Sequence, residues 1–329
     1  MTQKGASNDG SGIFVVVPSY NHAPFIERCV FSIIGQTVSP QKLLVIDDGS
    51  TDGSAELIAR VLNDCPFDSE LIARENRGLC ATLNQAFSLI SGKYFAYLGA
   101  DDIWLPDFLE QNQQLMEKRD DAALAYGHAY IINEHDEILG STTDYGGEYP
   151  EGNMKELLLQ GIAPMSTTIF YRRAALEGLS WNEGSRLEDY EMYLKLMDRG
   201  EFVFEPQILS AWRTHGYNTS KNSRMMVHEM IEAQNRNVHL LGVDAAELAA
   251  IQERIRFVYA HNLLQRGDKS GAASLARTSW RSARSAGELL KFTLRMALPM
   301  SLVNAKRRRS TRPRTKLQDL DRQKPEDSR

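Results

Sequence analysis

The chain has 329 residues, of which 42% are hydrophobic and 25% are charged, a composition typical of a soluble globular protein. This length is sufficient for one large α/β domain with a helical appendage. The formal net charge of −5 conceals an asymmetry, because residues 1–276 carry −15 whereas residues 277–316 carry +11. An acidic body argues against a general nucleic-acid-binding protein, and we expect no nucleic-acid partner.

The cysteines and the amino terminus favour a cytosolic location. Cys29, Cys65 and Cys80 are scattered without the spacing of a CxxC or zinc motif, so we interpret them as reduced thiols. Residues 1–11 are polar and lack the apolar core of a signal peptide. We expect this segment to be disordered.

Strands and helices alternate over roughly the first hundred residues. Apolar runs predict strands at 13–17, 42–46, 69–73 and 93–97, and helical spacing predicts helices at 24–34, 53–62 and 79–90. This alternation predicts parallel βαβ units with right-handed crossovers. No GxGxxG motif follows the first strand, which disfavours a dinucleotide-binding domain.

Two adjacent carboxylates, Asp101 and Asp102, follow the strand predicted at 93–97. Open α/β sheets bind their ligands at the carboxyl ends of the strands. Carboxylate oxygens are the donors that Mg²⁺ or Mn²⁺ requires there. The same stretch also fits a solvated turn in which Asp102 caps the helix that Pro106 begins. The pair by itself does not decide between the two.

The rest of the chain is less regular up to about residue 220 and helical beyond it. We expect helices at 108–118, 154–159 and 187–197, strands at 122–132, 167–171, 202–204 and 208–212, and a hairpin or mobile loop at 134–149. The predicted organisation is a disordered segment (1–11), an α/β domain (12–220), a helical region (221–304) and a basic, disordered tail (305–329).

Five polar segments stand in a fixed order along the α/β domain, at residues 18–21, 45–52, 98–106, 187–190 and 212–215. This ordered combination resembles the family 2 glycosyltransferases of the GT-A fold. The resemblance implies one nucleotide-binding α/β domain with a central, mainly parallel sheet, here followed by a C-terminal helical extension. It also implies transfer of a sugar from a nucleoside diphosphate sugar, UDP-linked in our expectation, with inversion at the anomeric carbon.

The resemblance assigns nucleotide contacts to residues of the first loops. Pro18 and Tyr20 match the loop that lines the nucleobase, and a tyrosine face suits stacking on a base. Asp48 matches the carboxylate that accepts a hydrogen bond from the base, although Asp-Gly-Ser is also a good turn sequence. Asn76 belongs to a matching asparagine-glycine turn. Relatives often have an arginine where this chain has Leu83, so no phosphate contact is expected there.

The metal motif departs from the pattern of the family that the chain resembles. Relatives commonly show Asp-x-Asp, and Gly99 replaces the first aspartate. Asp101 aligns with the aspartate that binds the cation and contacts the nucleotide, and Asp102 could add a second oxygen. Arg213 and His215 match the segment that closes over the diphosphate, and a neutral imidazole also binds cations. The resemblance therefore implies Mg²⁺ or Mn²⁺, although His215 alone also fits an ordinary loop histidine.

Glu188-Asp189 matches an acidic pair whose second member is the catalytic base. Such a base takes the proton of the acceptor as its oxygen attacks opposite the departing diphosphate. Both carboxylates also suit a helix start. The catalytic role of Asp189 is therefore inferred from the order of the segments and not from the pair itself. Residues 206–212 lack the QxxRW motif of processive synthases. The resemblance therefore implies transfer of one or a few sugars.

The basic segment 277–316 raises the question of a membrane. The longest uncharged run in its apolar part, residues 296–305, has ten residues, about half of what a spanning helix needs. Apolar and basic residues are arranged as in an interfacial helix. This pattern predicts a cytoplasmic protein that is peripheral on an anionic membrane. The resemblance implies a glycan or lipid-linked acceptor and a role in bacterial surface polysaccharide synthesis. A helix packed on the catalytic domain with a solvated tail fits equally well.

Two other functions stay open at this point. Gly99 and Leu83 suggest a catalytically inactive protein that binds a nucleotide sugar or a glycan. A sugar-nucleotidyltransferase also uses paired aspartates on an α/β sheet, but its first loop would be rich in glycine and basic residues. Residues 18–22 are not of that kind.

Overall fold

The structure is a computed structural model that describes residues 12–145, 150–216, 218, 222–299 and 316–319. Within these residues, nine strands form one mixed sheet in the order β3-β2-β1-β4-β8-β6-β9-β5, with β7 beside β6. The strands are β1 (Ile13–Ser19), β2 (Lys42–Asp47), β3 (Ser69–Ala73), β4 (Tyr94–Tyr97), β5 (Ile103–Trp104), β6 (Ala122–Ile132), β7 (Ile138–Ser141), β8 (Phe170–Arg172) and β9 (Glu201–Arg213).

The parallel part of the sheet agrees with the predicted βαβ units. β1 pairs in parallel with both β2 and β4, and β2 pairs in parallel with β3. β8 runs antiparallel between β4 and β6, so β6 and its parallel neighbour β9 point the same way as β1. The carboxyl ends of β1, β2, β4, β6 and β9 therefore meet at one edge of the sheet.

Two predictions in the middle of the chain need correction. The strands expected at 202–204 and 208–212 are one strand, β9, because a shift in its register with β6 absorbs Pro206 and Gln207. Proline lacks the N–H that a regular ladder needs, so a bulge is where it is tolerated. The strand expected at 167–171 begins later, at Phe170, after a short 3₁₀ turn.

Helices cover both faces of the sheet. Side chains of β1 alternate between the two faces, as in a strand buried on both sides. Val15 and Val17 pack with α1 (Ile26–Ile34), α2 (Ser54–Asn63) and α4 (Phe108–Glu117). Phe14 and Val16 pack on the opposite face with α3 (Leu79–Leu89), α5 (Lys155–Leu159) and α6 (Glu188–Leu196).

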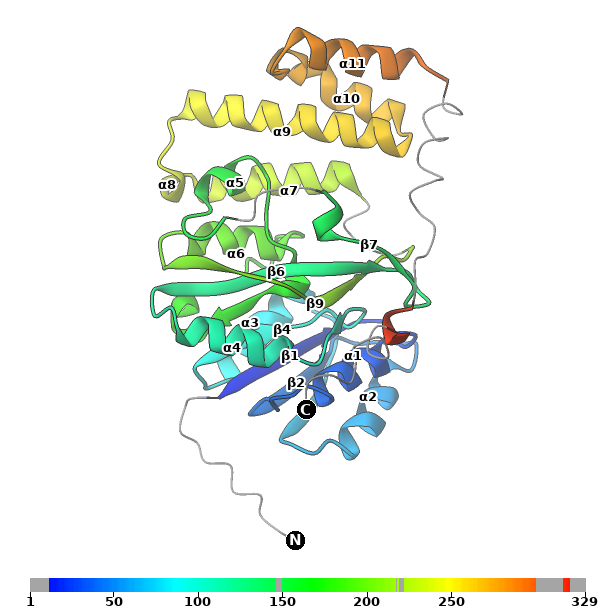
Figure 1. Ribbon diagram of the computed structural model, residues 1–329, viewed down its shortest axis with the longest axis vertical. Helices are drawn as coiled ribbons and strands as arrows, with labels where there is room; N and C mark the ends of the chain where they lie inside the picture. Colours follow the sequence, from blue (N-terminus) through cyan, green and yellow to red (C-terminus); the bar gives the residue numbers. More distant parts are fainter. Residues whose placement is uncertain (1–11, 146–149, 217, 219–221, 300–315, 320–329) are drawn as a thin grey trace, which may run out of the picture.

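The C-terminal helices stack outward from α6 (Figure 1). They are α7 (Ser223–Arg236), α8 (Val238–Leu241), α9 (Ala245–Arg266), α10 (Lys269–Ser279) and α11 (Ala286–Ala297). The buried Gln234 side chain of α7 donates to the Leu159 carbonyl (3.0 Å) and the Tyr190 hydroxyl (2.9 Å), which joins α7 to α5 and α6. The boundary near residue 220 stays a prediction. In the described part of the chain, no helix has both the length and the apolar character needed to span a bilayer.

A short segment after the helices returns to the sheet, beside β7 (Figure 1). The backbone of Lys316 forms an isolated antiparallel β-bridge with that of Glu137, and the Leu317 N–H donates to the Asp136 carbonyl at 3.0 Å. The buried Leu317 side chain packs with apolar residues of four strands: Ile103, Ile132, Ile138 and Ala211. The expectation of a disordered tail over 305–329 is therefore not met at 316–319. The other residues of that range, and residues 1–11, lie outside the described residues.

Candidate functional site

A cavity of about 1670 Å³ opens at the sheet edge where the carboxyl ends of the parallel strands meet. Of the nine site residues predicted from the sequence, eight line it: Pro18, Tyr20, Asp48, Asn76, Asp101, Asp102, Asp189 and His215. The ninth, Arg213, does not. Strand direction explains the convergence of seven of them, because they follow or end strands that all finish at this edge. Asp189 is the exception, since it lies in the first turn of α6 (Glu188–Leu196).

The loop after β1 presents an aromatic face to the cavity. Tyr20 is 48% exposed there, whereas Tyr94, Tyr97, Tyr126 and Tyr171 of the sheet are buried. The loop is held by the turn after β2, since the Asn21 N–H donates to Ser50 Oγ (2.8 Å) and the Thr51 N–H donates to Asn21 Oδ1 (2.9 Å). An exposed ring on a fixed loop is suited to stacking on a flat ligand.

Asp48 fixes the loop that carries Asn76. Its two carboxylate oxygens accept from the backbone N–H groups of Arg77 (2.9 Å) and Gly78 (2.7 Å), and the Arg74 guanidinium pairs with it at 2.6 Å. The structure thus gives Asp48 a positioning role in the cavity wall. The predicted hydrogen bond from a base to Asp48 stays a prediction.

His22, Asp101 and His215 form a cluster of possible metal ligands. The His215 Nε2 atom lies 2.8 Å from Asp101 Oδ2, and one ligand atom of each residue lies within 4.8 Å of the others. Burial lowers the pKa of His22 in spite of the nearby Asp101 charge. The lowered pKa favours the neutral form of the imidazole. Two imidazoles and one carboxylate fit a divalent cation. His22 was not predicted, and its only signal is its place directly after the loop 18–21.

The prediction for Arg213 needs correction, because this side chain is 1% exposed and points away from the cavity. Its guanidinium donates to the carbonyls of Asp101 (2.6 Å) and Asn133 (2.8 Å) and pairs with Asp136 at 2.6 Å. Neighbouring side chains of a strand face opposite sides, and it is Trp212 that lines the cavity. Arg213 therefore supports the wall of the site from behind.

The Asp102 side chain also contacts Arg213, at the end of β9. Its Oδ1 accepts the backbone N–H of Arg213 at 2.8 Å, and it is not a member of the metal-ligand cluster. Burial, followed by the nearby charge of Asp101, raises its pKa well above the usual range. These contacts suit a positioning residue for the end of β9 better than a cation ligand.

Glu188 and Asp189 form the first turn of α6 and line the cavity. Burial raises the pKa of Asp189 to about 6, and burial together with the Asp189 charge raises the pKa of Glu188 to about 8. Behind them lie the buried rings of Tyr97 and Tyr171, stacked with centroids 6.4 Å apart. At neutral pH the pair therefore holds one proton, and Asp189 is the member that is ionised and basic.

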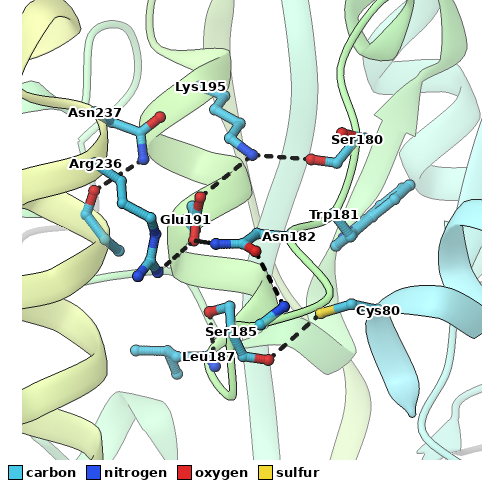
Figure 2. Close-up of polar contacts among 12 residues, drawn as sticks. Cys80, Ser180, Trp181, Asn182, Ser185, Leu187, Glu191, Lys195, Arg236 and Asn237 are labelled. Atoms are coloured by element: carbon cyan, nitrogen blue, oxygen red, sulfur yellow. Dashed lines mark hydrogen bonds and ion pairs between the residues drawn. The ribbon is translucent and has the colours of Figure 1, made fainter. Parts of the chain in front are cut away.

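The first turn of α6 and the loop before it are held by polar contacts (Figure 2). Figure 2 shows Glu191 of α6 reached by Arg236 (2.7 Å), Lys195 (3.4 Å) and Asn182 (3.3 Å). The Cys80 thiol of α3 donates to the Ser185 carbonyl at 3.6 Å. The loop before the pair is thus tied to α3, α6 and α7, which restricts the movement of the two carboxylates.

The proton on Glu188 has a consequence for stability. A carboxyl whose pKa is raised in the folded state stabilises the fold at low pH, and this stabilisation is lost as the pH rises through the folded pKa of about 8. We expect Glu188→Gln, which is neutral at every pH, to melt a few degrees higher than the parent at pH 8–9. The difference should vanish as the pH falls toward 4.5. Calorimetry from pH 5 to 9 measures the melting temperatures of both proteins. The same pH dependence of the melting temperature in the two would contradict the raised pKa of Glu188.

Comparisons with known proteins show the family and the fold of the chain. The family model for glycosyl transferase family 2 matches residues 14–179. An uncharacterized glycosyltransferase of Nostoc sp. is 29% identical over 168 residues, which are 50% of this chain and 52% of that protein. A chondroitin synthase of Escherichia coli is 30% identical over 233 residues, 70% of this chain and 33% of that protein. The chain thus spans about half or less of the length of these two relatives.

Solved structures share the fold at low sequence identity. TarS 1-349 of S. aureus in complex with UDP-GlcNAc has a TM-score of 0.58 at 14% identity, covering 92% of this chain and 93% of that one. The mannosyltransferase PcManGT from Pyrobaculum calidifontis, in complex with GDP-Man and Mn²⁺, has a TM-score of 0.58 at 17% identity, with 89% and 86% covered.

Proposed function

The chain belongs to glycosyl transferase family 2, and from that premise we propose that it transfers a sugar from a nucleoside diphosphate sugar to a glycan or lipid-linked acceptor. We propose a UDP-linked donor, inversion at the anomeric carbon and a role in bacterial surface polysaccharide synthesis. The observation that carries the proposal is the single cavity that gathers Tyr20, Asp101, His215 and Asp189 at the sheet edge. Two solved structures of the same fold hold nucleotide sugars, UDP-GlcNAc in one and GDP-Man in the other.

The residues divide into a donor side and an acceptor side. Pro18 and Tyr20 hold the base, and Asn76 lies in the adjoining wall. Asp101 and His215 are suited to hold a divalent cation, either Mg²⁺ or Mn²⁺, which when bound would neutralise the negative charge of the diphosphate leaving group. A solved structure of the same fold contains Mn²⁺.

Asp189 takes the proton of the acceptor hydroxyl while that oxygen attacks the anomeric carbon. Its raised pKa of about 6 leaves it ionised at neutral pH and makes it a stronger base than an ordinary aspartate. The attack occurs opposite the departing diphosphate, so one displacement inverts the configuration. The proton held by Glu188 leaves a single negative charge on the pair, which avoids repulsion between adjacent carboxylates.

One alternative has a specific observation behind it. Gly99 supplies no carboxylate to the cavity wall, and Leu83 is wholly buried, so neither contributes a polar contact to a donor. A catalytically inactive protein that binds a nucleotide sugar would keep the cavity and lose the reaction. Binding and turnover therefore have to be measured separately.

The test is a panel of sugar nucleotides added to the full chain, with Mn²⁺, with Mg²⁺ and with chelator. We expect one nucleotide to raise the melting temperature in the presence of a cation, because a ligand that binds only the folded state stabilises it. The same donor should then be hydrolysed slowly or transferred, with product configuration read by NMR. Stabilisation without turnover would support the inactive binder, and no stabilisation by any donor would overturn the proposal.

We further propose that the protein is cytoplasmic and binds the anionic inner face of a membrane through α11 and the basic residues of segment 277–316. Leu290 and Leu294 are 58% and 57% exposed and lie one turn apart on the face of α11 opposite the buried Phe292, and Leu298, 42% exposed, follows directly after the helix. The exposed Lys291 lies next to this row. An apolar row flanked by cations is the pattern of an interfacial helix.

A double substitution, Leu290→Glu with Leu294→Glu, tests this surface. We expect the parent to sediment with phosphatidylserine-containing vesicles at low salt and the double variant to lose most of this binding, because it places two anions against an anionic surface. High salt should release the parent, since exposed charges are screened over about 8 Å at physiological ionic strength. Leu89→Glu, at a leucine that is 54% exposed on α3, is the matched control. Equal sedimentation of the double variant and the parent would remove the membrane proposal.

A further inference from the structure

We propose that His22 is a third protein ligand of the divalent cation, beside Asp101 and His215, and that this donor set favours Mn²⁺ or another first-row transition metal over Mg²⁺. The inference rests on the proposed cation at Asp101 and His215. It adds a ligand from a segment that the metal motif does not include.

The backbone of His22 is fixed independently of any cation. The N–H groups of residues 21–23 donate, in order, to three side chains of the turn after β2: Ser50 Oγ at 2.8 Å, Ser54 Oγ at 3.0 Å and Asp52 Oδ2 at 2.9 Å. Three consecutive donors thus hold the loop in one conformation. A ligand on a fixed backbone loses little freedom when it binds, which favours binding.

The His22 side chain lies against the other two ligands. Its ring is nearly perpendicular to that of His215, at 83°, with the centroids 6.4 Å apart. The ligand atoms of the three residues lie within 4.8 Å of one another, and all three side chains line the cavity. A cation at about 2.1 Å from each ligand atom holds adjacent ligands about 3 Å apart, so small side-chain rotations are sufficient.

Two imidazoles and one carboxylate select cations differently from a pair of carboxylates. Gly99 provides no side-chain oxygen, and the Asp102 Oδ1 atom already accepts the Arg213 N–H. Mg²⁺ prefers an octahedron of oxygens, whereas imidazole suits transition metals. Replacing a carboxylate ligand by an imidazole therefore weakens the binding of Mg²⁺ more than the binding of Mn²⁺.

The experiment titrates Mn²⁺ and Mg²⁺ separately into the full chain by calorimetry, with free Mn²⁺ followed by electron paramagnetic resonance. We expect His22→Gln to weaken Mn²⁺ binding tenfold or more, since even indirect support of a metal ligand is worth 10–100-fold in affinity. We also expect the preference for Mn²⁺ over Mg²⁺ to shrink. His22→Asn should reproduce both changes. His135→Gln, a histidine of the same cavity outside the cluster, should retain the parent affinity and preference.

The outcomes separate this inference from the proposed function. If both His22 variants keep the Mn²⁺ affinity of the parent while Asp101→Asn binds Mn²⁺ more weakly, His22 is not a ligand. The cation is then held by Asp101 and His215 alone. Unchanged affinity in Asp101→Asn as well overturns the cation site itself. A protein that binds Mn²⁺ through His22 but transfers no sugar from any donor contradicts the proposed transferase activity and leaves this inference standing.

Discussion

Asp189→Asn is expected to lower the rate of sugar transfer by about 10² or more at saturating acceptor, because base catalysis typically contributes that much. Asparagine keeps the size of the side chain but cannot take a proton. The parent rate should rise with pH through an apparent pKa near 6, the value to which burial raises Asp189. The variant should lose this rising limb together with the rate. Initial rates between pH 5 and 8 measure both effects.

Donor binding separates a catalytic loss from a structural one. Asp189→Asn should bind the donor nearly as well as the parent, since the proposed role of Asp189 lies on the acceptor side. Asp198→Asn makes the same chemical change at an exposed position just beyond the end of α6 and should leave the rate unaltered. Near-normal turnover in Asp189→Asn would mean that another residue is the base.

Arg213→Met is expected to destabilise the fold by about 3–5 kcal/mol, the cost of breaking a buried ion pair from one side. Arg213 is 1% exposed and its partner Asp136 is 3% exposed. Water therefore cannot replace the lost partner when one member of the pair is removed. The substitution also leaves the carbonyls of Asp101 and Asn133 without the donors that they now have. Urea unfolding of the full chain, followed by fluorescence and circular dichroism, measures the change.

Two comparisons test the cause of this loss. Arg28 also pairs with Asp136 but is 37% exposed, so Arg28→Met should cost less. Adding Asp136→Asn to Arg213→Met removes the buried carboxylate that the single variant leaves with Arg28 as its remaining ion-pair partner, and the double variant should be more stable than the sum of the single losses implies. A loss below about 1 kcal/mol in Arg213→Met would show that the pair does not hold the end of β9.

Local sequence patterns were sufficient for much of the fold. The alternation of apolar runs predicted β1 to β4 and the helices between them, because period and turn residues are local properties. The GT-A fold and the family are confirmed by the comparisons. The strand-end position of Asp101 also followed from local pattern, since parallel strands bring their carboxyl ends to one edge.

The errors share a physical cause, which is that they depend on contacts distant in the sequence. A lone arginine is usually exposed, and Arg213 is buried only because Asp136 and two carbonyls from other segments surround it. The strands predicted at 202–204 and 208–212 are one strand, because Pro206 lies in a bulge against β6. His22 has no ligand spacing along the chain, since its partners lie after β4 and β9.

The segment 316–319 has a consequence for how the protein is made. It follows the end of β9 by more than 100 residues, yet Leu317 covers Ile103, Ile132, Ile138 and Ala211 beside the turn that holds Asp136. At about 5–20 residues per second, the ribosome needs on the order of 5–20 s to produce that stretch. During this interval the nascent sheet exposes an apolar patch next to the strand ends that build the cavity. Closing so long a loop is slow, so these apolar side chains are covered only after Leu317 has left the exit tunnel.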